Sequence, residues 1–152
     1  MFNVMATIKT FEEIEAWQQA RSLAGRIHKL TQEGSFARDF KLINQINGAS
    51  GSVMDNIAEG FERGGTREFV QFLSIAKGSA GEVRSQLYRA MDRSHITQET
   101  FYELKSDVII ISKLLSGLIN YLNTSGMKGS KFIREPSEVY SGDGLWTLNL
   151  EK

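Results

Sequence analysis

The chain has 152 residues, of which 41% are hydrophobic and 24% are charged, so it is long enough for one domain with a substantial core. The 18 Lys and Arg residues balance the 18 Asp and Glu residues, and zero net charge provides no overall attraction to nucleic acid or anionic membranes. The absence of cysteine excludes disulfides and thiolate metal sites, and no apolar run is long enough to span a membrane. We therefore expect a cytoplasmic protein.

Apolar residues recur every three or four positions through most of the chain, which predicts four consecutive helices. The first helix is predicted over residues 11–31 and the second over residues 36–63. The third is predicted over residues 67–93. The fourth begins after Thr97, a suitable N-cap, and its apolar stripe continues without interruption to Leu122.

The connections between the predicted helices are short, so consecutive helices should be antiparallel neighbours. Gly64 and Gly65 mark the connection between the second and third helices. The expected fold is all-α: an antiparallel up-down-up-down four-helix bundle over residues 1–125. We expect residues 126–152 to form an irregular C-terminal tail or arm, in which the alternating stretch 145–150 would be a short strand, a docking arm or a disordered end.

Two predicted helices carry glycines in their interiors, at Gly48 and Gly51 in the second and at Gly78 and Gly81 in the third. Each costs about 1 kcal/mol relative to alanine, so their presence needs a reason. Antiparallel pairing through the short turn places the two pairs opposite each other. This predicts an unusually close approach of the two helices. The favoured interpretation is tight packing, and the alternative is a groove for a ligand or another subunit.

Polar residues flank the predicted buried stripes at Asn56, Glu59, Glu82 and Gln86. A buried carboxylate must be paired or hydrogen-bonded, so we interpret these residues as a structural polar network that fixes the helix register. A general acid/base pair of Glu59 and Glu82 is the alternative. The helix pairing separates these two residues by roughly three turns, which disfavours that pair and leads us to predict a protein that is not an enzyme.

The histidines of the chain do not match the pattern of a di-iron site. A di-iron site in a bundle needs two Glu-x-x-His motifs, whereas the chain has two histidines in total, His28 and His95, and neither lies in that motif. We therefore expect no metal and no other cofactor. A Ser-His-Asp triad is compatible with two histidines, although the sequence contains no nucleophile-turn motif.

Basic residues are concentrated on the predicted third helix and the turn before it. Lys77 and Arg84 share a helix face, but Arg89 lies roughly 140° away from it. The favoured interpretation is a solvated or salt-bridged surface, and the alternative is contact with nucleic acid. The candidate nucleic-acid contacts are Arg63, Arg67, Lys77, Arg84, Arg89 and Arg93.

Apolar residues outside the four buried stripes predict that the chain associates with copies of itself. They comprise four aromatic residues and a second apolar flank on the first predicted helix: Phe2, Phe132, Tyr140, Trp146, Ala16, Leu23 and Ala24.

Four ordered segments resemble motifs of a known bacterial family. Residues 11–21 resemble its opening F-E-x-L-x-x-W-x-x-A, and residues 56–61 resemble its N-I-A-E-G signature. Residues 68–79 resemble E-F-x-x-F-L-x-I-A-x-G-S, and residues 82–87 resemble E-x-x-x-Q-L. The family is that of the four-helix-bundle proteins encoded in intervening sequences of 23S ribosomal RNA genes, also called the S23 ribosomal protein family.

This resemblance implies an antiparallel four-helix bundle that assembles as a homopentamer and has no established enzymatic activity. A related branch contains the accessory proteins of diversity-generating retroelements, which associate with a reverse transcriptase and RNA. Many family members carry an Arg-Arg pair followed by a proline ahead of the N-I-A-E-G signature. Here those positions are Asn47, Gly48 and Met54, and the loss of the basic pair weakens an implied affinity for nucleic acid.

Overall fold

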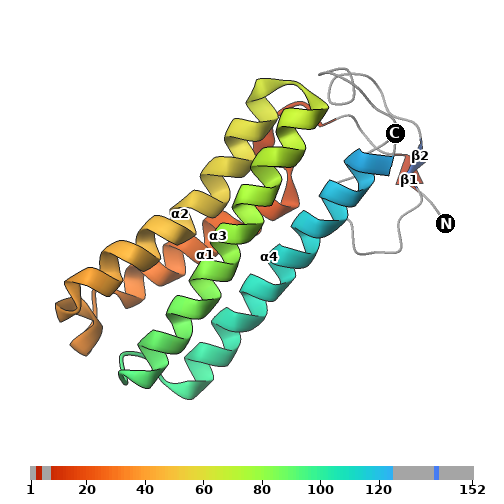
Figure 1. The fold of residues 1–152 in the computed structure, drawn as a ribbon. Coiled ribbons are helices and arrows are strands. Elements are labelled where there is room, and N and C mark those ends of the chain that lie inside the picture. Colours follow the sequence, from red (N-terminus) through yellow and green to blue (C-terminus); the bar gives the residue numbers. More distant parts are fainter. Residues whose placement is uncertain (1–2, 5–7, 125–138, 141–152) are drawn as a thin grey trace.

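Four long antiparallel helices form the body of the molecule (Figure 1), in a computed structural model that describes residues 3–4, 8–124 and 139–140. This arrangement confirms the predicted all-α four-helix bundle. The helices are α1 (Glu15–Leu30), α2 (Phe40–Arg63), α3 (Thr66–Asp92) and α4 (Gln98–Thr124). Two 3-10 helices, η1 (Phe11–Glu13) and η2 (Gly34–Arg38), precede α1 and α2, respectively.

A two-residue strand near each chain end completes the described structure. The strands β1 (Asn3–Val4) and β2 (Val139–Tyr140) pair in antiparallel fashion beside the bundle (Figure 1). The C-terminal tail or arm predicted over residues 126–152 lies outside the described residues except for β2. No described helix has the length and apolarity that a membrane span requires.

The first two helices begin later than predicted, because each is preceded by a break. Ile14 is extended and buried between η1 and α1, so the predicted first helix is divided there. Residues 34–38 form η2, and α2 starts only after Asp39, whose carboxylate Oδ1 accepts a hydrogen bond from the Leu42 N–H at 3.3 Å. A side-chain oxygen that caps the first turn favours a helix start at that residue.

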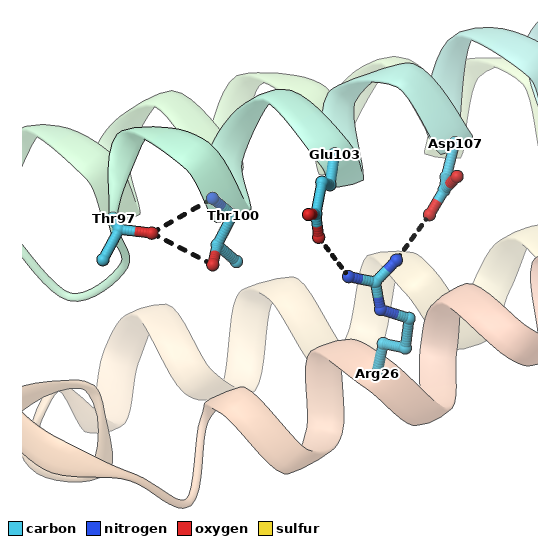
Figure 2. Close-up of polar contacts among 5 residues, drawn as sticks. All are labelled: Arg26, Thr97, Thr100, Glu103 and Asp107. Atoms are coloured by element: carbon cyan, nitrogen blue, oxygen red, sulfur yellow. Dashed lines mark hydrogen bonds and ion pairs between the residues drawn. The ribbon is translucent and has the colours of Figure 1, made fainter.

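The predicted apolar stripe of α4 is confirmed, and it packs into the core shared by all four helices. Its buried members are Phe101, Leu104, Val108, Ile111, Leu115, Leu118 and Leu122. Thr97 caps this helix as predicted, because its Oγ1 accepts a hydrogen bond from the Thr100 N–H at 3.1 Å (Figure 2).

Arg26 links α1 to α4 on the outside of the bundle, as Figure 2 shows. Its two terminal nitrogens lie 2.9 Å from Asp107 Oδ2 and 3.1 Å from Glu103 Oε1. These side chains are exposed, so the pairs contribute little to stability. They mark where α1 and α4 lie side by side, while the shared apolar core holds the two helices together.

The prediction that the four interior glycines bring α2 and α3 together is wrong. A Cβ atom added at Gly48, Gly51, Gly78 or Gly81 would meet nothing within 4 Å. The buried small residues beside them are instead Ala49 and Ser50 in α2, and Ser79 and Ala80 in α3. The helical period therefore turns the glycines outward.

The close approach of α2 and α3 occurs at Gly60, one turn before the connection between them. A Cβ added there would lie 2.6 Å from the Phe72 Cβ and 3.1 Å from Phe69 Cδ1. Gly64 then ends α2 with φ of 84°, a left-handed conformation that glycine adopts without steric cost. Together these two glycines determine how the second and third helices meet.

Candidate functional site

Ser35, His95 and Asp39 form a continuous hydrogen-bonded chain at the end of the bundle where η2 meets the α3–α4 turn. Ser35 Oγ lies 2.7 Å from His95 Nδ1, and His95 Nε2 lies 2.9 Å from Asp39 Oδ2. The imidazole is enclosed, with its side chain only 9% exposed. It stacks on the buried ring of Phe36, with ring centroids 5.0 Å apart and planes 17° apart.

Two left-handed residues shape the loops that bring these side chains together. Gly34 begins η2 with φ of 55°, and Ser94 adopts φ of 61° between α3 and α4. The His95 N–H donates to the Ala90 carbonyl at 2.9 Å, which holds the turn against the end of α3. His95 is therefore fixed through its backbone as well as through its ring.

The charges around Asp39 determine which hydrogen bonds the imidazole makes. The hydrogen bond from His95 and the contact with Arg93, whose Nη1 lies 2.8 Å from Asp39 Oδ2, lower the pKa of Asp39 to about 2. An ionised carboxylate only accepts hydrogen bonds. In the neutral imidazole the hydrogen is therefore on Nε2, and Nδ1 accepts the hydrogen bond that the Ser35 hydroxyl donates.

An open groove with a volume of about 600 Å³ lies beside this chain of residues. Its walls come from the end of α1 and from the α3–α4 turn. The lining residues are Leu30, Glu33, Met91, Ser94, His95, Ile96, Thr97, Gln98 and Thr100. His95 thus faces both Ser35 and a space that a small molecule can enter.

The Ser35–His95–Asp39 arrangement was not identified from the sequence. Position 39 falls within the predicted second helix, and His95 is 60 residues from Ser35. One local signal was available, because Asp39 stands three residues before the buried Leu42, as an N-cap residue would. The partnership itself depends on the meeting of two connections at one end of the bundle.

The predicted polar network exists in part, with different members. Asn56 Nδ2 donates to the Ser52 carbonyl oxygen at 2.8 Å and to Ser52 Oγ at 2.9 Å. Ser52 Oγ lies 2.8 Å from Ser79 Oγ, so the hydroxyl groups join α2 to α3. Both serines were missed in the sequence analysis, although they stand next to the interior glycines Gly51 and Gly78 that it identified.

The prediction that Glu59 and Glu82 belong to a buried polar network is wrong. Glu82 and Glu59 are exposed, and Glu59 Oε2 pairs with Arg63 Nη2 at 2.8 Å. Gln86 is buried, but its Oε1 accepts no hydrogen bond within the described part of the chain. The two glutamates sit on the solvent side of their helices because Val53, Ile57 and their counterparts in α3 occupy the buried side. They form no acid/base pair.

The six candidate nucleic-acid contacts divide into two groups. Arg93 is engaged with Asp39, and Arg63 with Glu59 at 2.8 Å and Glu68 at 3.8 Å. The other four form no ion pair with any described residue: Arg67, Lys77, Arg84 and Arg89. Within the described ranges, no group of three His, Asp or Glu side chains is placed to hold a metal ion.

Comparison with known proteins finds a matching sequence family and solved structures with a similar fold. The sequence profile of the 23S rRNA-intervening sequence proteins matches residues 12–117. A crystal structure of a protein of unknown function from the S23 ribosomal protein family of Bacteroides thetaiotaomicron is similar, with 25% sequence identity and a TM-score of 0.63. That match covers 68% of this chain and 97% of the other. A search of curated proteins found no match.

Proposed function

Since this chain belongs to the 23S rRNA-intervening sequence protein family, we propose that it is a self-assembling helical bundle that serves as a scaffold or accessory protein. In this proposal the assembly is a homopentamer, which the family resemblance implies, and the protein works by presenting surfaces rather than by turnover of a substrate. The observation that supports assembly is the set of outward-facing glycines in α2 and α3.

Within the described part of a single chain, no close packing contact requires glycine at these four positions. Gly48, Gly78 and Gly81 are exposed, Gly51 is half-buried, and open space surrounds the Cβ position of each. Glycine in a helix interior costs about 1 kcal/mol relative to alanine, so four of them weaken α2 and α3 without any compensating contact. A second copy packed against these helices would supply that contact, because glycine allows two backbones to approach closely.

Exposed apolar side chains support the same proposal. Ile75 lies one turn before Gly78 and is 51% exposed, and Phe40 at the start of α2 is 72% exposed. Burial of such side chains contributes about 25 cal/mol for each Å² removed from water. Apolar residues on an outward helix face are commonly buried against another copy of the same chain.

Native mass spectrometry tests the assembly. We expect the wild-type chain to form a pentamer and Gly78→Arg to shift it to smaller species, because an arginine side chain would occupy the space reserved for the neighbouring copy. Gly25→Arg is the matched control, since Gly25 also has open surroundings but lies on α1. A wild-type chain that stays monomeric at every concentration, or equal effects of the two variants, would contradict the proposal.

A second candidate function is an accessory module that binds RNA or DNA and acts with an RNA or reverse-transcriptase partner. The observation that favours it is a cationic and aromatic flank between α3 and α4. Lys77 and Arg84 lie seven positions apart on one side of α3. Lys105 Nζ of α4 lies 3.1 Å from Tyr88 Oη. Tyr88 and Tyr102 are 42% and 55% exposed, and exposed aromatic rings can stack on unpaired bases.

Fluorescence anisotropy with a single-stranded RNA oligonucleotide over a range of salt concentrations tests this candidate. Each phosphate contact contributes about 0.7 to the slope of log affinity against log salt concentration. Replacing Lys77 and Arg84 with alanine should therefore reduce the slope by about 1.4. The double variant Lys29→Ala and Arg38→Ala removes the same charge from exposed positions elsewhere and should leave the slope unchanged. Salt-independent binding, or no binding at low salt, would rule the candidate out.

A further inference from the structure

We propose that Ser35 is an activated nucleophile that accepts an acyl group from an uncharged carboxylic ester, with His95 as its general base. This goes beyond the scaffold role, which requires no covalent chemistry. The proposal rests on the hydrogen-bonded chain of Ser35, His95 and Asp39 and on the groove beside it.

The hydrogen bonds have the polarity that serine activation needs. Asp39 accepts from His95 Nε2–H at 2.9 Å, so the unprotonated Nδ1 faces the Ser35 hydroxyl at 2.7 Å. A base within this distance can remove the hydroxyl proton as the oxygen attacks. The carboxylate holds the imidazole in the required tautomer and stabilises the imidazolium that forms, as the acid does in serine hydrolase triads. The ring presents Nδ1 to the serine, and either nitrogen is basic when the other carries the hydrogen.

The imidazole base is buried and the serine nucleophile is exposed, as a reactive site requires. The imidazole is 9% exposed and held by the Phe36 ring on one face. Asp39 is also held by Arg93, which keeps the carboxylate ionised. Ser35 itself is exposed, so an electrophile can reach its Oγ from solvent.

The acylation step is balanced without any further reactant. Ser35 Oγ forms a bond to the ester carbonyl carbon while its proton moves to His95 Nδ1. The resulting adduct collapses, the bond between the carbonyl carbon and the leaving alkoxide oxygen breaks, and the Nδ1 proton passes to that oxygen. The products are a Ser35 ester and a free alcohol, and the imidazole returns to its starting state.

The groove indicates which esters suit the site. His95 lines the groove and Ser35 does not, so an acyl group on Ser35 would extend past the imidazole to reach the apolar side chains of Leu30, Met91 and Ile96. Glu33 also lines the groove, and its carboxylate would repel an ester that carries a negative charge. A neutral ester with a short apolar acyl group is therefore the favoured donor.

The experiment uses p-nitrophenyl butyrate with the full-length chain. Release of p-nitrophenolate gives the rate, and peptide mass spectrometry locates the butyryl group. We expect one butyryl group per chain, on Ser35, and no labelling of Ser35→Ala. Ser106→Ala is the matched control, because Ser106 is also exposed but makes no hydrogen bond with another described side chain. The Ser106→Ala protein should be labelled on Ser35 at the wild-type rate.

Two further variants separate activation from folding. Asp39→Asn keeps a good N-cap for α2 but removes the charge, and His95→Asn removes the base; each should slow acylation about 100-fold. Far-UV circular dichroism identifies variants that remain folded. The proposal is overturned if folded Ser35→Ala is labelled like wild type, or if folded Asp39→Asn and His95→Asn are acylated at the wild-type rate.

Discussion

Replacing Phe36 with alanine is expected to lower the free energy of unfolding by about 3–5 kcal/mol, the usual cost of removing a fully buried phenylalanine side chain. Phe36 lies in η2, outside the four long helices, yet its side chain is only 1% exposed. Its ring stacks on His95 and thereby joins the α1–α2 connection to the α3–α4 turn. Its loss would leave a cavity beneath both connections.

Phe40→Ala is the matched control for this prediction. Phe40 is four positions further along the chain and is 72% exposed, so its truncation should change the stability of a single chain by no more than about 0.5 kcal/mol. Urea denaturation followed by circular dichroism measures both values. If the two variants were equally stable, Phe36 would not anchor the connections, and the geometry of the Ser35–His95–Asp39 chain would need another support.

Gly60→Ala should lower the free energy of unfolding by about 1 kcal/mol net, because overpacking the core at this position costs about 2 kcal/mol. The new methyl group would lie 2.6 Å from the Phe72 Cβ. That atom is attached directly to the α3 backbone, so the helices themselves would have to move apart. A better helix propensity of alanine, worth about 1 kcal/mol, would offset only part of this cost.

Gly25→Ala tests whether the effect comes from packing rather than from helix propensity. A Cβ at Gly25 would meet nothing within 4 Å, so this variant should gain up to about 1 kcal/mol. Thermal and urea unfolding of the two variants should therefore move in opposite directions. A stabilised Gly60→Ala protein would show that α2 and α3 do not need their close approach at this position.

The two connections at the Ser35 end of the bundle link stability to the proposed chemistry. Asp39 caps α2, and it also accepts hydrogen bonds from His95 and Arg93. One carboxylate thus starts a helix, binds the opposite turn and orients the imidazole. Substitutions at Asp39 should consequently be compared at equal helix content before any change in the Ser35 reaction is attributed to the imidazole.

Helix content, helix order and the buried stripe of α4 could be predicted from the sequence because they depend on local periodicity. Phe101, Leu104 and Val108 recur at helical spacing, and each is buried as that spacing predicts. The end of α2 was equally local, since Gly64 adopts the left-handed conformation that commonly terminates a helix. The antiparallel bundle followed from these helices and their short connections.

The rotation of each helix about its axis was only partly predictable. The glycine at position 60 is buried against Phe72, whereas those at positions 48 and 78 face open space, although all three look alike in sequence. A helix face is assigned from the average of many apolar residues, so residues at the margin of the stripe, such as Glu82, can be placed on the wrong side. Only the packed neighbours decide which small residue is the point of contact.

The sequence by itself determined the family, the four helices and their antiparallel order, because these depend on residues close together in the chain. Only the tertiary structure brought Ser35 within 2.7 Å of His95, across 60 residues, and placed Asp39 on the other ring nitrogen. Such contacts arise where two connections meet, and their geometry depends on left-handed backbone at Gly34 and Ser94. No local periodicity encodes that meeting, because the core must first hold the helix ends together.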